Sequence, residues 1–252
     1  MKKVEVGNPL IRLQTVDSTN NYAAQLIKQG SVQEGTVILA VHQTQGKGQA
    51  GSRWLSEEGA NLLLSAILKP DFLPADKQFY LSMCIATAIA DFIERYNVPA
   101  MIKWPNDIMI RKRKVGGILI ENTIMKENLA YAIIGIGLNV NQTVFPEDLP
   151  NPTSLRLETG TEISLQTSLT SLFGKLNFHI NQLYKGSFAP IKLDYLNKLW
   201  RMNTWAAYAD YSGEFEGRII DVTETGELVV MRRNGETKNH WFKEITFVDS
   251  DQ

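Results

Sequence analysis

The sequence predicts an α+β body followed by a small, barrel-like β domain at the C-terminus. Up to about residue 184, short apolar runs typical of buried strands alternate with longer segments of helical periodicity. After Trp205 only short strand patterns separated by turn signals follow. The chain has 252 residues, 44% of them hydrophobic, and this length corresponds to roughly 1.7 domains of ordinary size. We therefore expect a main domain over residues 1–204 and a second domain over residues 205–252.

The beginning of the body predicts a strand, a helix and a buried strand. Residues 10–16 alternate weakly between apolar and polar side chains. Residues 17–20 are all of types that favour a helix N-cap, so we expect a helix over residues 20–29 that ends at Gly30. The run 36–41 is apolar and rich in β-branched residues, which predicts a buried strand.

The rest of the body predicts four more strands and two longer helices. In the helices, apolar side chains recur at three- and four-residue steps, as on the buried face of an amphipathic helix. The strands at 107–110 and 115–121 form a hairpin around a basic tip. The predicted ranges are 61–68, 107–110, 115–121 and 130–140 for the strands, and about 74–93 and 165–183 for the helices.

The C-terminal segment predicts hairpins only. Residues 213–222 are expected to pair with residues 227–232 across a short polar turn. Asn234 followed by Gly235 is a strong signal for a two-residue hairpin turn.

Bulk charge and the scarcity of reactive side chains exclude several classes of function. The formal net charge is −1, which gives no support for binding to nucleic acid or to an anionic membrane. The lone cysteine, Cys84, lies in an apolar run and is expected in the core. The three histidines lie in separate segments, so no multi-histidine metal site is expected, and His179 lies on the apolar face of its predicted helix. A signal-peptide core and a membrane-length apolar run are both absent from the sequence, which predicts a cytoplasmic protein.

A glycine-rich loop is the first segment suited to chemistry. Gly46, Gly48 and Gly51 have the spacing of a dinucleotide-binding fingerprint, but that fingerprint requires a strand that leads into a helix. Here the segment lies between two predicted strands, and Ser52 stands where a P-loop requires lysine. The loop is either a plain surface loop or one that presents backbone amides and cations to phosphate oxygens.

Three further segments concentrate polar groups or glycines at strand ends. A bend at residues 103–107 combines a cation, a turn-forming Pro-Asn pair and a carboxylate. Lys114 stands just before a pair of glycines, and glycines inside a strand mark the close approach of a ligand or another backbone. Residues 135–139 again place glycines in an apolar strand, which ends in an amide side chain.

These segments occur in the order found in biotin–protein ligases. The order is Ser-Thr-Asn at residues 18–20, the glycine-rich loop, Lys-Trp-Pro-Asn-Asp, Lys-x-Gly-Gly and Gly-x-Gly-x-Asn. Each motif alone is weak, but the ordered set is specific, and it covers residues 15–140 densely. The chain therefore resembles the form of this family that has no N-terminal DNA-binding domain. The resemblance implies a mixed sheet flanked by helices, related to class II aminoacyl-tRNA synthetases, followed by an SH3-like β barrel.

The resemblance also implies an activity. Biotin and ATP would form biotinyl-AMP and pyrophosphate, and biotin would then pass to a lysine of a biotin carboxyl carrier domain. Lys114 is implied to neutralise charge at the reacting phosphate, and Asp107 to act on the incoming lysine. Mg²⁺ is expected to arrive with ATP rather than on a protein metal site. We expect no repressor activity, no nucleic acid or membrane partner, and a monomer or homodimer.

Binding residues are carried over from the same motifs. For biotin they are Ser18, Thr19, Asn20, Gln43, Lys47, Gly48, Gln49, Lys114, Gly117 and Leu119. For ATP they are Lys47, Gln49, Arg53, Trp54, Asn106, Lys114 and Asn139.

The glycine-rich loop departs from the family pattern Gly-Arg-Gly-Arg-x-Gly-Arg-x-Trp. The three arginine positions hold Lys47, Gln49 and Ser52, and Arg53 follows one place later. Lysine is a point charge without the bidentate geometry of arginine, and the other two residues carry no charge. We expect this loop to hold a triphosphate or an adenylate less tightly, with the reaction type unchanged.

Three other functions are compatible with parts of the pattern. A lipoate–protein ligase shares the fold and a related Asn-Asp…Lys-x-Gly-Gly run, although not the Ser-Thr-Asn start. A non-catalytic binder of biotin or adenylate is compatible with the weakened loop. An NAD-dependent oxidoreductase rests only on the glycine spacing.

Overall fold

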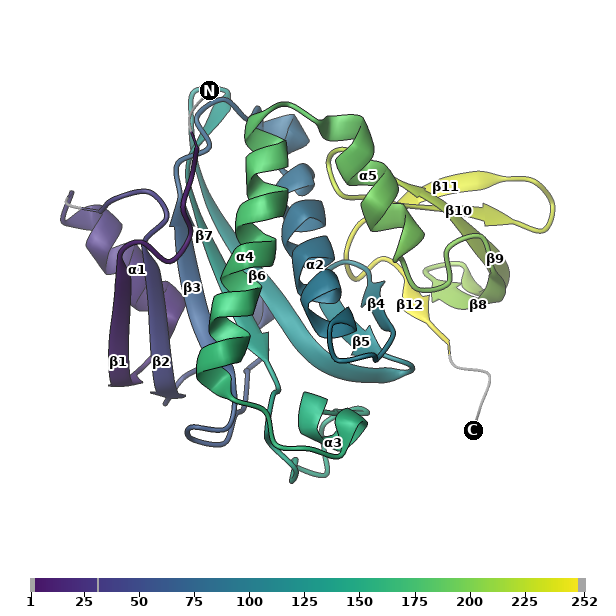
Figure 1. The fold of residues 1–252 in the computed structure, drawn as a ribbon. Helices are drawn as coiled ribbons and strands as arrows, with labels where there is room; N and C mark the ends of the chain where they lie inside the picture. The colour runs from purple at the N-terminus through teal and green to yellow at the C-terminus, as the bar shows by residue number, and fades with distance from the viewer. Residues whose placement is uncertain (1–2, 31, 249–252) are drawn as a thin grey trace.

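The computed structural model describes residues 3–30 and 32–248, which form two β-sheets with helices around the larger one (Figure 1). The larger sheet has seven strands in the order β1-β2-β3-β7-β6-β5-β4. β1 runs parallel to β2 and every other neighbouring pair is antiparallel, so the sheet is mixed. The strands are β1 (Leu10–Val16), β2 (Val37–Gln43), β3 (Leu62–Leu68), β4 (Ala100–Lys103), β5 (Asp107–Ile110), β6 (Arg113–Met125) and β7 (Asn128–Leu138).

Helices cover both faces of this sheet. α2 (Phe79–Glu94) lies on one face with α4 (Leu165–Tyr184) and α5 (Phe188–Asn197) packed over it, and α1 (Thr19–Lys28) lies on the other face (Figure 1). α3 (Leu155–Thr159) is a single short helix beyond the end of β7. Alternate residues of one strand therefore enter different clusters, and Ile67 packs under α1 while its neighbours in β3 face α2.

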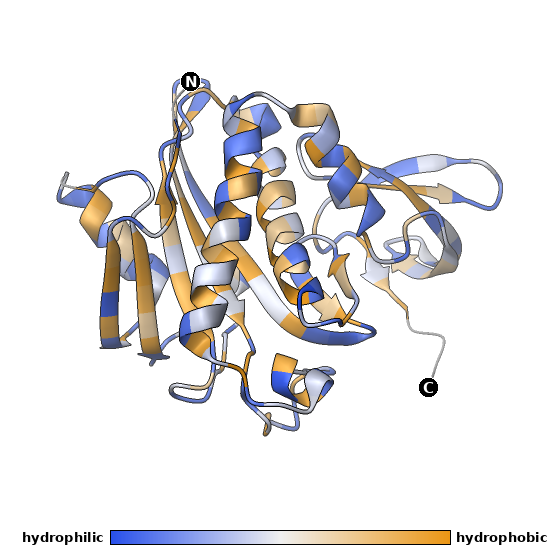
Figure 2. Ribbon diagram, viewed as in Figure 1, coloured by the Kyte–Doolittle hydropathy of each residue, from blue (hydrophilic) through white to orange (hydrophobic). Residues whose placement is uncertain are grey.

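The burial of β3 and α2 follows from this layering. All seven residues of β3 are buried, because the strand lies inside the sheet and is covered on both faces. α2 is apolar around most of its circumference, as a helix between a sheet and a second helix layer must be (Figure 2). Cys84 of α2 is fully buried, as expected, and burial raises the pKa of its thiol. His179 of α4 is also buried, with Nε2 2.9 Å from Asp91 Oδ2.

The smaller sheet is antiparallel, and its strands follow in the order β11-β10-β9-β8-β12. The predicted barrel is not closed within residues 205–248, because β11 and β12 do not pair with each other. β12 is only two residues long, and both of its residues pair with β8. The strands are β8 (Trp205–Asp210), β9 (Gly213–Val222), β10 (Leu228–Arg232), β11 (Thr237–His240) and β12 (Thr246–Phe247).

The two sheets meet at the bend between β4 and β5. The indole Nε1 of Trp104 donates a hydrogen bond of 2.9 Å to the carbonyl oxygen of Gly226, which lies between β9 and β10. Trp104 is 4% exposed, so this bond is made inside the interface. The bend that carries polar groups of the site is thereby attached to the C-terminal sheet.

The predicted strands and the three predicted helices of the body are present, but the sequence analysis missed α3 and α5. α3 is shorter than two turns, and only the tertiary context stabilises such a helix. The connection over residues 111–112 is the tip of the β5–β6 hairpin, as expected. Among the described residues, no helix is both long enough and apolar enough to cross a membrane.

Candidate active site

The N-terminus of α1 supplies a buried cluster of polar side chains. Ser18, Thr19 and Asn20 are at most 3% exposed. The backbone N–H and hydroxyl of Thr19 both donate to Gln43 Oε1, at 2.7 and 3.1 Å, so the amide of Gln43 satisfies the helix end. The Ser18 hydroxyl makes no capping bond and lies at the wall of the cavity described below.

Ser65 of β3 connects this cluster to the sheet. Its hydroxyl lies 2.7 Å from Thr19 Oγ1 and 2.5 Å from Asn20 Oδ1. The Asn20 amide donates to Glu121 Oε2 at 2.6 Å and to the Leu119 carbonyl at 3.4 Å. We call Ser18, Thr19, Asn20, Gln43 and Ser65 the polar end. Their mutual hydrogen bonds hold a set of donors and acceptors in place before any ligand arrives.

Glycines in β6 and β7 allow side chains to approach these strands closely. A Cβ atom at Gly135 would lie 2.5 Å from Asn20 Oδ1, so only glycine leaves room for that amide. A Cβ atom at Gly137 would overlap the Trp54 indole, and one at Gly117 would lie 3.1 Å from it. The indole therefore rests on the bare backbone of two adjacent strands.

Lys114 and Asp107 form an ion pair in the middle of the site. Lys114 lies near the start of β6 and Asp107 is the first residue of β5, so the hairpin places them side by side. Their Nζ and Oδ1 atoms are 2.6 Å apart, with side chains 37% and 27% exposed. Lys114 Nζ also lies 5.7 Å from the centre of the Trp54 ring. Asn106 fixes the bend before Asp107, since its amide donates to the Ile118 carbonyl at 2.8 Å.

The glycine loop, residues 46–54, folds back on itself between β2 and β3. Lys47 and Arg53 form an antiparallel bridge. The Gly48 N–H donates to the Ser52 carbonyl at 2.7 Å, and the Trp54 N–H donates to the Gly46 carbonyl at 3.0 Å. The connection holds a single 3₁₀ turn and no α-helix, which agrees with the prediction that it does not precede a helix.

One cavity of about 610 Å³ joins the polar end, the ion pair and the glycine loop. Every biotin or ATP residue assigned from the sequence lines it except Asn139. Asn139 is buried beyond the end of β7, and its amide donates to the Thr153 carbonyl at 3.0 Å. Its role at the nucleotide stays a prediction that its position does not support, because β7 turns its side chain away from the cavity.

The cavity also includes residues that the sequence analysis did not assign. Lys103, Trp104 and Pro105 belong to a motif that was recognised, but they were given no role. The C-terminal contributions had no sequence signal, because they depend on how the two sheets pack. They are Phe242, Lys243, Ile245, Thr246 and Phe247.

The lining is poor in metal ligands. Among residues 3–30 and 32–248, no group of three or more His, Cys, Asp or Glu side chains is arranged to hold a metal ion. Asp107 is the single carboxylate of the described lining, and it is already paired with Lys114. The site therefore fits a cation that arrives with its own oxygen ligands better than a resident metal.

Comparisons with known proteins identify the family. A family model described as the biotin/lipoate A/B protein ligase family matches residues 12–139, slightly more than half of the chain. The chain belongs to this family. The resemblance noted in its motifs is thereby confirmed, and the matched segment contains most of the cavity residues.

Similar proteins within the biotin/lipoate A/B protein ligase family bear the names of biotin ligases. The bifunctional ligase/repressor BirA of Bacillus spizizenii is 31% identical over 239 residues, which cover 93% of this chain and 73% of that protein. The biotin–[acetyl-CoA-carboxylase] ligase of Paracoccus denitrificans is 29% identical over 226 residues, which cover 86% and 92%. The biotin protein ligase of Aquifex aeolicus, solved in complex with biotin and ATP, superposes with a TM-score of 0.79 at 28% identity, over 96% of this chain and 99% of that one.

Proposed function

We propose that this protein is a biotin–protein ligase that activates biotin with ATP and transfers it to a lysine of a biotin carboxyl carrier domain. One observation carries the proposal: a single cavity has a buried, uncharged polar end and a cationic end, and these meet at the Lys114–Asp107 pair. A bicyclic urea needs buried hydrogen-bond partners, and a triphosphate needs positive charge. Relatives named as biotin ligases support the same assignment.

The first step joins the two substrates. The ureido ring of biotin would occupy the polar end, with its valeryl carboxylate directed toward Lys114. The carboxylate oxygen attacks the α-phosphorus of ATP, a new P–O bond forms, and the bond to the β-phosphate oxygen breaks with its electron pair on pyrophosphate. Lys114 lowers the barrier by neutralising charge on the reacting oxygens, and the cavity supplies orientation.

The second step releases AMP. A lysine amine of the carrier attacks the acyl carbon of biotinyl-AMP, an amide bond forms, and the acyl–oxygen bond to AMP breaks. The attacking amine must lose a proton, and Asp107 is the carboxylate of the described lining that lies at the reacting centre. Its pairing with Lys114 at 2.6 Å keeps it oriented toward that position.

Mg²⁺ and the finer assignments belong to this proposal. Mg²⁺ would enter bound to ATP phosphates, in line with the sparse carboxylates of the lining. Residues 1–204 would form the catalytic unit, which residues 205–252 complete by closing one side of the cavity. A cytoplasmic location follows from the use of ATP.

We also propose that these 252 residues act without the repressor half of the bifunctional relatives. The net charge is −1, which does not favour DNA. Within residues 3–30 and 32–248, the first element is β1, and no helix pair precedes it. A biotin-dependent, salt-resistant shift of promoter DNA at nanomolar protein would contradict this part of the proposal.

The decisive experiment measures the product. Purified protein is incubated with labelled biotin, ATP and an apo carrier domain, and label on the carrier is followed beside pyrophosphate release. Biotinylation that disappears when the carrier lysine is changed to arginine supports the proposal. Transfer of lipoate instead of biotin would make the protein a lipoate ligase, and biotin binding without pyrophosphate release would make it a binder.

A further inference from the structure

The cavity has an excess of positive charge on the side of the C-terminal sheet. Asp107 is the one carboxylate of the described lining, and it is paired with Lys114. Of the cations, Lys103 and Lys243 have no carboxylate of the described residues within 4.0 Å. The cationic side chains of the lining are Lys47, Arg53, Lys103, Lys114 and Lys243.

Lys103 is held by aromatic rings rather than by a counter-ion. It is the last residue of β4, and its Nζ lies 5.3 Å from the ring centres of both Trp200 and Phe247. These two rings stack on each other with centres 5.5 Å apart. A cation over aromatic faces is attracted and positioned, but its charge is not neutralised. The ammonium therefore keeps its full charge for an anion in the cavity.

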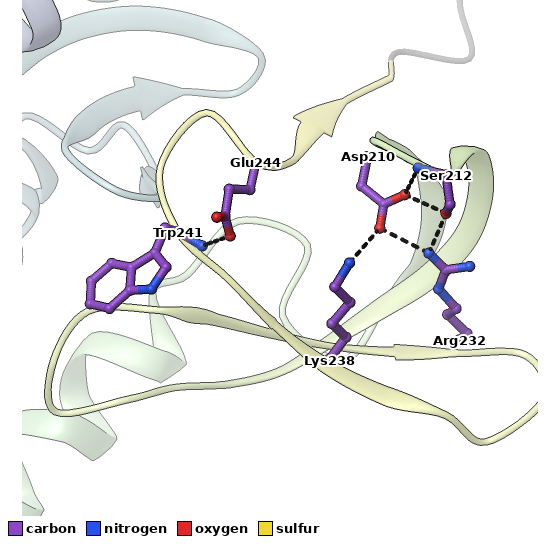
Figure 3. A network of polar contacts seen from close by, with 6 residues as sticks. All are labelled: Asp210, Ser212, Arg232, Lys238, Trp241 and Glu244. Atoms are coloured by element: carbon purple, nitrogen blue, oxygen red, sulfur yellow. Dashed lines mark hydrogen bonds and ion pairs between the residues drawn. The ribbon is translucent and has the colours of Figure 1, made fainter.

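Lys243 occupies a backbone position that favours glycine. It is the third residue of the turn over residues 241–244, in which the Glu244 N–H donates to the Trp241 carbonyl at 3.0 Å. Its φ is +72°, and Phe242 before it has an ordinary negative φ, the pattern of a type II turn. The turn is closed a second time by the Trp241 N–H, which donates to Glu244 Oε2 at 2.8 Å (Figure 3).

The strands behind this turn are braced by a buried ion cluster. Asp210, whose side chain has no exposed surface, accepts from Arg232 at 2.9 Å and from Lys238 at 3.3 Å (Figure 3). Lys238 belongs to β11, which leads directly into the turn. The turn therefore has a rigid base, and a lysine in the left-handed region on such a base indicates a function for its charge.

We propose that Lys103 and Lys243 bind the β- and γ-phosphates of ATP and hold pyrophosphate as it leaves. This inference rests on the proposed function. In an in-line displacement, the leaving group departs on the side opposite the attacking carboxylate. The carboxylate comes from the polar end, so pyrophosphate departs toward the mouth, where the C-terminal residues lie. Negative charge grows on its bridging oxygen as the P–O bond breaks, and the two ammonium groups offset that charge.

The composition of the glycine loop supports this assignment. Gln49 and Ser52 leave the loop with Lys47 and Arg53 as its cations. Lys103 and Lys243 come from outside the loop, and they supply the cavity with as many further charges. Positive charge that is absent from one wall is thus present on the opposite wall.

Lys243→Gly is the sharpest test, because it removes the charge and also relieves the backbone. The matched control is Lys126→Gly, since Lys126 has a φ of +59° in the β6–β7 turn and lies outside the cavity. We expect Lys243→Gly to raise the KM for ATP and the inhibition constant of pyrophosphate by about five- to tenfold, the scale of one partly screened charge-assisted contact. The KM for biotin stays unchanged, and the difference from wild type shrinks at high salt.

A second pair of variants addresses Lys103. Lys103→Met keeps the alkyl stem against the rings and removes the charge, whereas Lys103→Arg keeps the charge. We expect weaker binding of ATP and pyrophosphate in the first variant and recovery in the second. If both charge-removing variants bind ATP and pyrophosphate like wild type, and instead raise the KM for the carrier domain, the inference is overturned.

Calorimetry with pyrophosphate alone separates this inference from the proposed function. If wild type does not biotinylate any carrier, but pyrophosphate binding is lost in Lys243→Gly and kept in Lys126→Gly, the function falls and the phosphate assignment stands. If wild type biotinylates and pyrophosphate binds all four proteins equally, the function stands and the phosphate assignment falls.

Discussion

At the polar end of the cavity, each side chain is buried and most are hydrogen-bonded to one another, whereas at the mouth the charged side chains project from loops and are partly exposed. Asn20 is 3% exposed and is held by Ser65 and Glu121. Lys114 is 37% exposed and has one carboxylate partner. The difference matches two kinds of ligand. A neutral ring is selected by fixed donors and acceptors, while a triphosphate is held by charges that are strong without exact geometry.

The comparison also predicts different responses to mutation. Buried hydrogen-bonded groups form a network, so a change in one group disturbs the others. Exposed charges act more independently and are screened by salt. Four variants or conditions test whether the two ends behave in these ways.

The largest effect is expected at the junction of the two ends. Lys114→Ala should slow adenylate formation roughly a hundredfold or more, the scale of losing one preorganised charge at a transition state. Biotin binding should change far less, because the polar end is intact. Pyrophosphate release measured on a variant with an unchanged circular dichroism spectrum tests this. A rate near that of wild type would show that Lys114 is not the charge that matters.

A methyl group at the polar end should have the next largest effect. Gly135→Ala places its Cβ 2.5 Å from Asn20 Oδ1, so the amide must move and its hydrogen bonds weaken. We expect biotin affinity to fall about tenfold, the cost of one hydrogen bond, with the KM for ATP unchanged. Gly174→Ala is the matched control, because nothing lies within 4 Å of its added Cβ, and alanine stabilises a helix by about 0.5–1 kcal/mol. Equal biotin affinity in both variants would mean that the polar end is not rigid.

Restoring charge to the glycine loop should sharpen the cationic end. The double variant Gln49→Arg and Ser52→Arg adds two cations to the cavity wall, so preformed biotinyl-AMP should dissociate about tenfold more slowly, given 1.5–3 kcal/mol for a charge-assisted hydrogen bond. The dissociation rate is measured by Trp54 fluorescence or rapid filtration. Equal rates would show that Arg53 or backbone amides already hold the phosphate.

Acid should soften the mouth before the polar end, and this is the smallest effect. Burial lowers the pKa of His240, with Lys238 and Arg232 acting in the same direction against Asp210 and Glu244. The unfolded chain then binds the proton more readily, so this contribution to stability is present above about pH 6.5, the unfolded pKa, and is lost as pH falls below it.

His240→Phe is the control for the acid effect, because it keeps a ring beside Phe215 and removes the titration. Urea unfolding between pH 5 and 7 should show a smaller pH dependence in this variant than in wild type. An identical pH dependence would assign the effect to other groups.

Much of the fold could be predicted because its signals are local. The apolar run of β3, the helical periodicity of α2 and α4, and the hairpin that carries Asp107 and Lys114 each depend on a few neighbouring residues. α5 was missed, because residues 188–197 follow α4 after a short break and have only weak amphipathic patterning. The expected barrel is open, because closure depends on the length and partner of β12, which no local pattern encodes.

The site divides in the same way. The sequence by itself determined which residue types stand at strand ends and in which order: Ser-Thr-Asn, the glycine loop, Lys114 and the paired glycines. Only the tertiary structure decided that Gln43 satisfies the N-terminus of α1, that Asn139 turns toward Thr153, and that residues of the C-terminal sheet complete the cavity. These contacts join segments up to a few hundred residues apart, and they depend on strand register and on how two sheets pack. Register and packing minimise the free energy of the whole chain, so they are not encoded in any single segment.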